Sequence, residues 1–126
     1  MPKDIITSAD LPAPKGPYSP AIRANGFVFV SGQGPIDPKT GEVFRGDIKQ
    51  QTRMVLGNIR AILEAAGSSM VKVVKSSVYL ADIGDFAAMN EVYAAFFPSE
   101  PPARTTIQAA KLPLDIGVEI DVIALE

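Results

Sequence analysis

The sequence predicts an α+β fold in which two helices pack on one face of a mixed six-stranded β-sheet. Short runs rich in Val, Ile and Phe are typical of strands, and two longer segments carry apolar residues at helical spacing. In chain order these elements form two strand-helix-strand connections. Because such connections are right-handed, both helices should cover the same face of the sheet. A chain of 126 residues is expected to form a single domain over 1–126.

The N-terminal third is expected to be extended. Residues 5–7 are typical of a short strand, and residues 8–20 contain four prolines, which favour an ordered loop over a helix. Residues 27–33 are rich in Val and Phe and indicate a strand. Residues 37–41 favour a turn, so residues 42–44 should return as the hairpin partner of that strand.

The clearest helix is expected over residues 47–66. Asp47 and Gln50 can form a capping box at its start, and Gly67 can end it. Gly57 inside the helix costs about 1 kcal/mol relative to alanine, so we expect close packing against the sheet at this position. The residues expected on the buried face are Ile48, Thr52, Val55, Leu56, Ile59, Ile62, Leu63 and Ala66.

The second half continues with a strand over residues 71–80 and a second helix from Asp85, as its cap, to about Phe97. The last two strands are expected over residues 104–109 and 118–125. The expected buried stripe of the second helix comprises Phe86, Met89, Asn90, Tyr93, Phe96 and Phe97.

The last strand predicts an oligomer. Its even-numbered positions are all apolar, whereas the opposite side mixes acidic and aliphatic residues, namely Glu119, Asp121, Ile123 and Leu125. An open face of an antiparallel sheet is expected to be polar, and a partly apolar one usually meets a partner. We therefore expect the helix-free face to be buried between subunits. The alternative is a monomer that exposes some aliphatic side chains.

Composition excludes several classes of chemistry. The net charge is −2 and the basic residues are scattered, so no nucleic-acid partner is expected. No apolar run approaches the roughly 20 residues of a membrane span, and the N-terminus lacks the apolar core of a signal peptide. The absence of cysteine fits a reducing compartment, so a cytoplasmic location is expected.

The absence of histidine and cysteine also excludes the usual zinc sites and the Ser-His-Asp and Cys-His arrangements. No Gly-rich nucleotide loop is present. No metal and no cofactor are therefore expected. The side chains left for chemistry are those of Asp, Glu, Lys, Arg, Tyr, Ser and Thr, together with backbone amides.

Arg104 and Glu119 are the candidates for catalysis. Arg104 follows two prolines that stiffen its approach, and its planar fork suits a carboxylate. The alternative is a surface arginine that pairs with an acidic neighbour. Glu119 lies in an apolar strand, where a raised pKa would make it an acid or a base. The alternative is that Glu119 faces water or an arginine. Thr105 and Thr106 follow Arg104, and Thr106 shares its strand face.

Other candidates surround a possible binding site. Ser31 and Gly32 end a strand where glycine allows a ligand to approach the backbone, although a bulge is the commoner reason for such a pattern. Asn90 needs partners if it is buried, and it could bond a neighbouring loop or shape a pocket. Tyr18 stands in a proline-rich loop, where it could cover a site or pack under its own loop.

Nine short segments carry a family resemblance through their order along the chain: Gly16-Pro17-Tyr18-Ser19, Ser31-Gly32-Gln33, Pro38-Lys39-Thr40-Gly41, Ala65-Ala66-Gly67, Val73-Val74-Lys75, Asp85-Phe86, Asn90-Glu91-Val92-Tyr93, Pro102-Ala103-Arg104, and Leu112-Pro113 through Val118-Glu119-Ile120. Over essentially its whole length, the chain resembles the RidA/YjgF family of reactive-intermediate deaminases. The resemblance implies a chorismate-mutase-like fold, a homotrimer, and active sites in the clefts between subunits.

The resemblance also implies an activity. Members of this family hydrolyse the enamine and imine products of pyridoxal-phosphate enzymes, such as 2-iminobutanoate and 2-iminopropanoate, to 2-oxo acids and ammonia. By this resemblance, Arg104 would hold the substrate carboxylate and Glu119 would position or activate the attacking water. The residues expected to bind substrate are Tyr18, Ser31, Gly32, Asn90, Thr105 and Thr106.

Three departures from the family pattern bear on substrate preference. Thr106 replaces a frequent cysteine, Pro20 replaces a frequent glutamine, and Gly34 stands where an apolar residue is common. Two other functions are implied by relatives. One is a non-catalytic protein that senses 2-oxo acids or contacts a regulatory partner. The other is a ribonuclease, which the acidic composition and the scattered basic residues disfavour.

Overall fold

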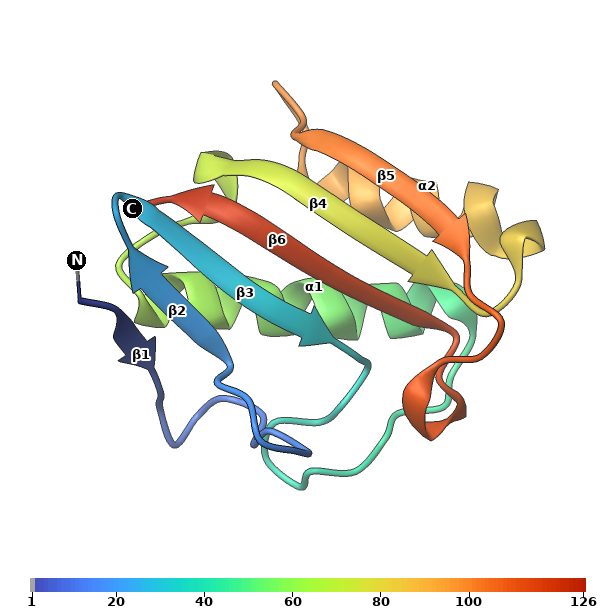
Figure 1. Cartoon of the computed structure of the whole chain (residues 1–126). Helices are drawn as coiled ribbons and strands as arrows, with labels where there is room; N and C mark the ends of the chain where they lie inside the picture. The colour runs from blue at the N-terminus through green and yellow to red at the C-terminus, as the bar shows by residue number, and fades with distance from the viewer. Residues whose placement is uncertain (1) are drawn as a thin grey trace.

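The computed structural model describes residues 2–126, so Met1 of the expected 1–126 domain lies outside the described residues. The sheet has six strands in the order β1-β2-β3-β6-β4-β5 (Figure 1). Their bounds are β1 Asp4–Ile6, β2 Ala21–Ala24, β3 Phe27–Gln33, β4 Val73–Leu80, β5 Ala103–Gln108 and β6 Val118–Leu125. The helices are α1, Ile48–Ala65, and α2, Phe86–Phe96.

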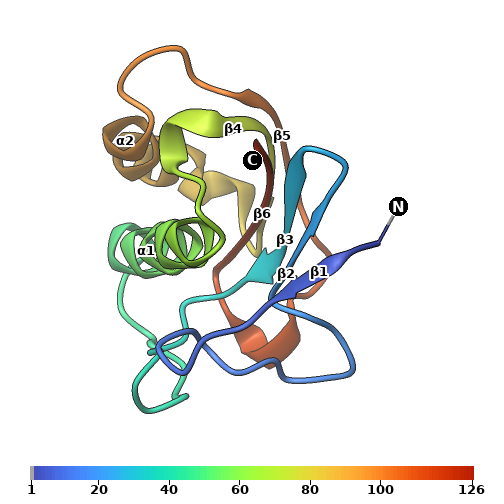
Figure 2. The same cartoon turned by 90° about the vertical axis from the view of Figure 1, so that its left-hand side faces the viewer.

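The sheet is mixed, because β4 and β5 are parallel while every other neighbouring pair is antiparallel. Figure 2 shows α1 and α2 side by side on the same face of the sheet. The α+β fold with two helices on one face of a mixed six-stranded sheet is therefore confirmed. The hydrophobic core lies between these helices and the sheet.

The hairpin prediction for residues 42–44 is wrong. β3 pairs with β2 and β6, and the 42–44 region contributes only a single bridge between Ile36 and Val43. The true partner, β2, is joined to β3 by Asn25 and Gly26, whose φ angles are 52° and 85°. Asn-Gly is the strongest two-residue hairpin signal because both positions tolerate positive φ. The Asn25-Gly26 dipeptide, and not the turn at residues 37–41, therefore sets the hairpin partner of β3.

Helix α1 begins and ends as expected. The Asp47 side chain accepts a hydrogen bond from the Gln50 amide at 2.8 Å, and the Gln50 side chain accepts from the Asp47 amide at 3.0 Å. Gly67 follows the helix with a φ of 81°. The prediction for Gly57 is wrong, because a Cβ there would have nothing within 4 Å apart from local helix backbone and its chain neighbours. The described chain gives no packing reason for this glycine.

Two boundaries also differ from the prediction. β4 begins at Val73, and a 3₁₀ turn occupies Met70–Lys72 before it. Asp85 does not cap α2 through its side chain; it ends a 3₁₀ turn in which Asp82 accepts from the Gly84 amide at 2.8 Å. Asp82 therefore caps the 3₁₀ turn that leads into α2, and α2 itself has no side-chain cap.

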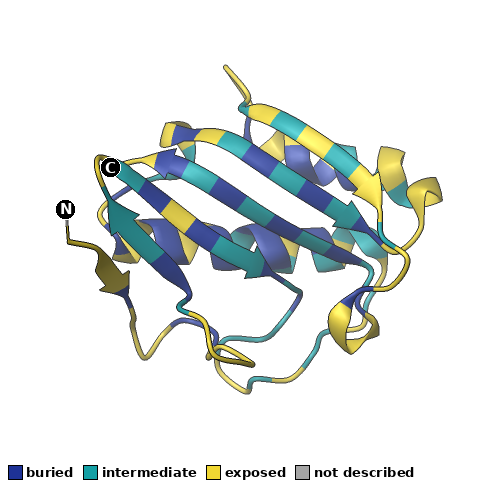
Figure 3. Ribbon diagram, in the orientation of Figure 1, coloured by how far each residue is buried: buried dark blue, intermediate teal, exposed yellow. Residues whose placement is uncertain are grey.

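The two faces of the sheet differ in burial, as the alternating residues of β6 predict. The even-numbered positions of β6 are buried beneath the helices, while the odd-numbered positions are half-buried or exposed (Figure 3). The helix-free face leaves Phe29, Ile107 and Leu125 exposed at 43%, 48% and 45%. This confirms a partly apolar open face. Among the described helices, none is long and apolar enough to cross a membrane.

Candidate active site

Arg104 lies on the helix-covered side of β5. Its register partner is Ser76 of β4, whose buried hydroxyl bonds the Tyr93 hydroxyl of α2 at 2.5 Å. The Arg104 Cζ lies 4.7 Å from the centroid of the Tyr93 ring and 5.5 Å from that of Phe86. These rings stabilise the cation and position its planar fork. Across residues 2–126, no carboxylate forms an ion pair with Arg104.

Two buried polar atoms accompany the guanidinium on this side of the sheet. Asn90 Oδ1 and Thr106 Oγ1 have no hydrogen-bond partner within the described chain. Buried polar groups normally form hydrogen bonds. A bound ligand would explain why these two atoms have no partner in the chain. We call the adjoining hollow the arginine pocket. It measures about 370 Å³ and is lined by Asn90, Tyr93, Ala94, Phe97, Pro101, Pro102 and Arg104.

Thr105 does not join this group. It is aligned with Ser77 on the opposite face of β5, where its hydroxyl accepts a hydrogen bond from Lys75 Nζ at 2.9 Å. It lines neither the arginine pocket nor the pocket around Glu119. The structure therefore places Thr105 on the opposite face of β5 from Arg104 and Thr106. Thr106 also lines neither pocket, and its buried hydroxyl lies beneath the helices.

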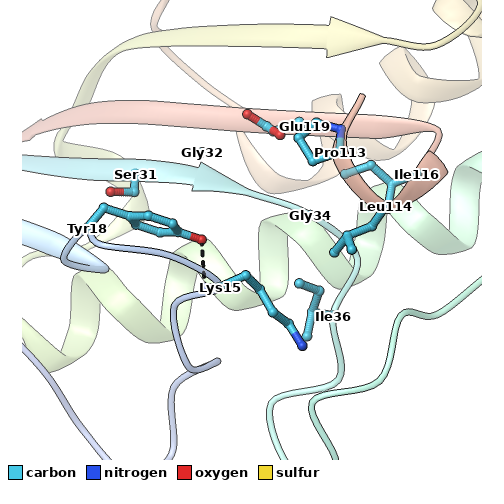
Figure 4. Close-up of a pocket in the computed structure, with 10 residues that line it drawn as sticks. All are labelled: Lys15, Tyr18, Ser31, Gly32, Gly34, Ile36, Pro113, Leu114, Ile116 and Glu119. Carbon is cyan, nitrogen blue, oxygen red and sulfur yellow. Dashed lines mark hydrogen bonds between the residues drawn. The ribbon is translucent and has the colours of Figure 1, made fainter. Parts of the chain in front are cut away.

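Glu119 lies on the helix-free side of β6, between the buried residues Val118 and Ile120. It borders an open pocket of about 450 Å³, the glutamate pocket, which Figure 4 shows. This pocket is lined by Lys15, Tyr18, Ser31, Gly32, Gly34, Ile36, Pro113, Leu114, Ile116 and Glu119. Four expected residues therefore meet here, namely Tyr18, Ser31, Gly32 and Glu119.

The glycine at position 32 makes room for Glu119. β3 has an irregular register between Val30 and Gln33, as expected of a bulge. A Cβ on Gly32 would collide with Glu119 Oε2 and lie 3.0 Å from its Cδ. The carboxylate therefore rests directly on the strand backbone, which is the close approach that glycine permits.

The proline-rich loop is tied to the same bulge. The Ser31 hydroxyl donates to the Ser19 carbonyl at 2.6 Å, and the Ser31 amide donates to the Pro20 carbonyl at 3.0 Å. These bonds place Tyr18 beside the pocket, and its hydroxyl accepts from the Lys15 amide at 3.1 Å (Figure 4). Tyr18 remains 48% exposed, so its ring is free to contact a ligand.

Electrostatics favour an acid or base at Glu119. Burial raises the pKa of Glu119, and the negative charge of Asp121 on the same face raises it further. Burial also raises the pKa of Asp121, although the Tyr79 hydroxyl, which donates to it at 3.3 Å, opposes this. A carboxyl group with a raised pKa keeps its proton to a higher pH than an ordinary one, which suits it to accept and return a proton during a reaction.

Arg104 and Glu119 cannot hold one small ligand within a single chain. Glu119 on β6 is aligned with Tyr79 on β4, and Tyr79 is aligned with Ile107 on β5. Arg104 lies three positions before Ile107 on β5. Arg104 and Glu119 are therefore about 10 Å apart across the strands and about 10 Å apart along them. The two side chains also leave the sheet on opposite faces. Within one chain, each pocket therefore holds only part of the expected site residues.

Several lining residues escaped the sequence analysis. Lys15, Ile36, Leu114 and Ile116 lie on loops around the glutamate pocket, where no periodic pattern marks them. The only signal was the Leu112-Pro113 segment within the family motifs. Among the described residues, no three Asp or Glu side chains gather as a metal site would require.

Comparison with known proteins identifies the family. The family model described as endoribonuclease L-PSP matches residues 8–126. A RutC family protein of Pyrococcus horikoshii is 56% identical, covering 97% of both chains. A 2-iminobutanoate/2-iminopropanoate deaminase of Capra hircus is 43% identical and covers 97% of this chain and 89% of its own.

Solved structures agree with the sequence comparison. The crystal structure of E. coli TdcF with bound serine matches with a TM-score of 0.92 and 40% identity, covering 98% of each chain. This match supports the fold class that the family resemblance implies. The protein therefore belongs to the endoribonuclease L-PSP family, which is the RidA/YjgF family of the resemblance.

Proposed function

We propose that this protein hydrolyses reactive enamines and imines of 2-oxo acids, such as 2-iminobutanoate and 2-iminopropanoate, to 2-oxo acids and ammonia. The observation that carries this proposal is the complementarity of its two half-sites. One half offers a guanidinium without an ion-pair partner in residues 2–126. The other half offers a carboxyl group with a raised pKa. Relatives named as imine deaminases support the same activity.

The two halves meet only if separate copies combine. We propose a homotrimer, the number that the family resemblance implies, in which Arg104 of one subunit faces Glu119 of the next. The exposed apolar side chains of Phe29, Ile107 and Leu125 support burial of the helix-free face. Each trimer would then hold three equivalent clefts.

The arginine pocket suits the carboxylate of the substrate, which does not react. Arg104 would bind the carboxylate through both prongs of its fork, a geometry stronger than a single neutral hydrogen bond. Asn90 Oδ1 and Thr106 Oγ1 lack partners in the described chain, and they could take hydrogen bonds from a polar ligand. The bound serine of E. coli TdcF supports a ligand of this kind, because serine carries a carboxylate beside a nitrogen.

The reaction balances with one water. The water oxygen adds to C2 of the imine while Glu119 accepts a proton from that water. Glu119 returns this proton to the nitrogen, which gives a carbinolamine. It then accepts the proton of the carbinolamine hydroxyl and passes it to the nitrogen, so that C2–O becomes a carbonyl as the C2–N bond breaks. The products are the 2-oxo acid and ammonia, and the carboxylate stays on Arg104 throughout. Positioning and one proton carrier suffice, because imine hydrolysis is intrinsically facile.

One experiment distinguishes the proposed function from its alternatives. An amino-acid oxidase generates 2-iminobutanoate in situ, and its disappearance is followed with and without the protein. Acceleration supports the proposal. If the protein gives no acceleration but binds 2-oxobutanoate, it is a binding or regulatory protein. The family description also names an endoribonuclease, so cleavage of a labelled RNA without any effect on the imine would support that activity instead.

A further inference from the structure

The glutamate pocket has two chemically distinct ends. Tyr18, Ser31 and Glu119 supply its polar side chains, and the reaction would occur beside Glu119. Figure 4 shows Ile36, Leu114 and Ile116 on the far side of the pocket from Tyr18 and Ser31. The Lys15 side chain reaches the same side, where its ammonium donates to the Gly41 carbonyl at 3.0 Å. The proposed chemistry uses only the polar end, so the apolar end needs a separate explanation.

The backbone that carries Leu114 is strained. Leu114 and Asp115 are consecutive non-glycine residues with φ angles of 63° and 54°. This left-handed region costs an L-residue roughly 1–2 kcal/mol at each position, and such strain persists only where the surroundings enforce it. Strain of this kind often marks functional sites.

An arginine from a distant loop holds this turn in place. Arg45 donates through one guanidinium nitrogen to the Leu114 carbonyl at 2.9 Å and through the other to the Asp115 carbonyl at 3.3 Å. Lys111 adds an ion pair to Asp115 at 3.5 Å. The strained turn is therefore fixed by side chains that have no other partner among the hydrogen bonds and ion pairs of the described chain.

The result of this arrangement is an aliphatic side chain at the pocket wall. Leu114 remains 46% exposed, although an isobutyl group gains free energy by burial. The strain of this turn and the exposure of Leu114 both cost stability, so the arrangement does little for the fold. It is well suited to contact an apolar group that enters the pocket.

Gly34 makes room for Ile116 in the same region. A Cβ at this position would lie 2.8 Å from Ile116 Cδ1, which is closer than real contacts allow. The φ of Gly34 lies outside the positive range, so the backbone itself does not require glycine. The missing side chain therefore allows Ile116 to pack against the backbone at the apolar end.

We infer that the apolar end, formed by Ile36, Leu114 and Ile116, receives the side chain of the substrate and selects 2-imino acids with an aliphatic side chain larger than ethyl. This inference rests on the proposed function. 2-Iminobutanoate has seven non-hydrogen atoms and would fill at most about 210 Å³, taking the roughly 30 Å³ of a water molecule for each atom. The glutamate pocket measures about 450 Å³ in one chain, before the neighbouring subunit of the proposed trimer borders it, so this volume is the upper bound on the room for a longer chain.

The test compares two imines on the same enzyme. An amino-acid oxidase supplies 2-iminopropanoate from alanine and 2-imino-4-methylpentanoate from leucine, and kcat/KM is measured for each. We expect the wild type to prefer the larger imine. Leu114→Ala removes part of the apolar wall, and Gly34→Val displaces Ile116 from it, so each should lower the preference for the larger imine about tenfold. Val71→Ala, at a position that is 90% exposed, is the control and should leave the preference unchanged.

The positioning role of Arg45 has its own readout. Arg45→Met should lower the preference for the larger imine while leaving kcat/KM for 2-iminopropanoate within about twofold, because only the turn is released. A purely structural role would instead lower both values together. Binding of 4-methyl-2-oxopentanoate and 2-oxopropanoate, measured by calorimetry on the same variants, provides a readout besides activity.

The outcomes separate the two proposals. If the wild type accelerates the loss of neither imine, the proposed function fails. If it accelerates both, but prefers the smaller imine or keeps its preference in Leu114→Ala and Gly34→Val, the proposed function stands and the apolar subsite is overturned. Should the variants fail to fold, the wild-type preference and the calorimetric comparison of the two oxo acids still decide the question.

Discussion

The Arg104 guanidinium and the Glu119 carboxyl group leave the same sheet on opposite faces. Arg104 lies over the Tyr93 ring beneath α2, and Glu119 rests on the backbone of Gly32 on the helix-free side. This relationship divides the expected site between the two sides of one subunit. If both residues act on one substrate, two copies of the chain must contribute to each cleft.

Arg104→Ala should abolish most of the activity. Loss of a bidentate hold on the carboxylate should lower kcat/KM by roughly 30- to 1,000-fold, or about 2–4 kcal/mol. Arg53→Ala is the matched control, because Arg53 is exposed on α1 and lines neither pocket. Steady-state kinetics with 2-iminobutanoate would measure the effect. Equal kcat/KM values for the two variants would contradict the assigned role of Arg104.

Gly32→Ala should impair activity more than stability. The new methyl group would displace the end of the Glu119 side chain, while the backbone of Gly32 does not require glycine. Gly26→Ala should show the reverse, because Gly26 has a φ of 85° but no neighbour within 4 Å of an added Cβ. It should lower the free energy of unfolding by roughly 1 kcal/mol and spare kcat/KM. Urea unfolding and kinetics on both variants test this contrast.

The stability that Glu119 and Asp121 contribute should fall as pH rises through their raised pKa values. Burial raises the pKa of both groups, despite the opposing contributions of Tyr79, Ser77 and Lys75 at Asp121. Above the ordinary carboxyl pKa of about 4, these two groups bind more protons in the folded chain than in the unfolded chain, so their contribution to the free energy of unfolding decreases with pH. Glu119→Gln should make this decrease shallower.

The measurement is urea unfolding between pH 4 and 7 at a fixed protein concentration, since assembly would couple to folding. The wild type and Glu119→Gln are compared at each pH. Parallel pH dependences would show that Glu119 does not titrate differently in the folded chain, and its assignment as a proton carrier would lose its electrostatic support.

Tyr93→Phe should destabilise the fold without removing the cation-binding ring. The buried Ser76 hydroxyl would lose its partner at 2.5 Å, which should cost roughly 1–3 kcal/mol. Removing both hydroxyls with Ser76→Ala should recover part of this loss, because no buried group remains unpaired. Thermal or urea unfolding of the single and double variants tests this. A double variant less stable than Tyr93→Phe would contradict the interpretation.

Periodic segments made most of the fold predictable. The capping box of α1 and the alternation of β6 were read directly from the residues, because one buried face imposes a regular pattern. The wrong hairpin partner arose where no periodicity exists. Ala21–Ala24 is short and lacks a strand pattern, so only the Asn25-Gly26 turn could have identified it.

The candidate site was predictable only in part. Family motifs placed Arg104 and Glu119, but no sequence pattern reveals that they lie on opposite faces, because that depends on strand register. Thr105 was grouped with Arg104 by adjacency, although neighbouring residues of a strand face opposite ways. The apolar end of the glutamate pocket depends on a strained turn at Leu114, which tertiary contacts from Arg45 enforce.

A mixed-subunit experiment tests the central claim most directly. Arg104→Ala and Glu119→Gln are co-expressed with different tags, and trimers that carry both are purified and assayed with 2-iminobutanoate. If each cleft takes Arg104 from one subunit and Glu119 from the next, every purified mixed trimer holds one intact cleft of three and should show about a third of the wild-type activity. Mixed trimers no more active than the two separate variants would contradict a site shared between subunits.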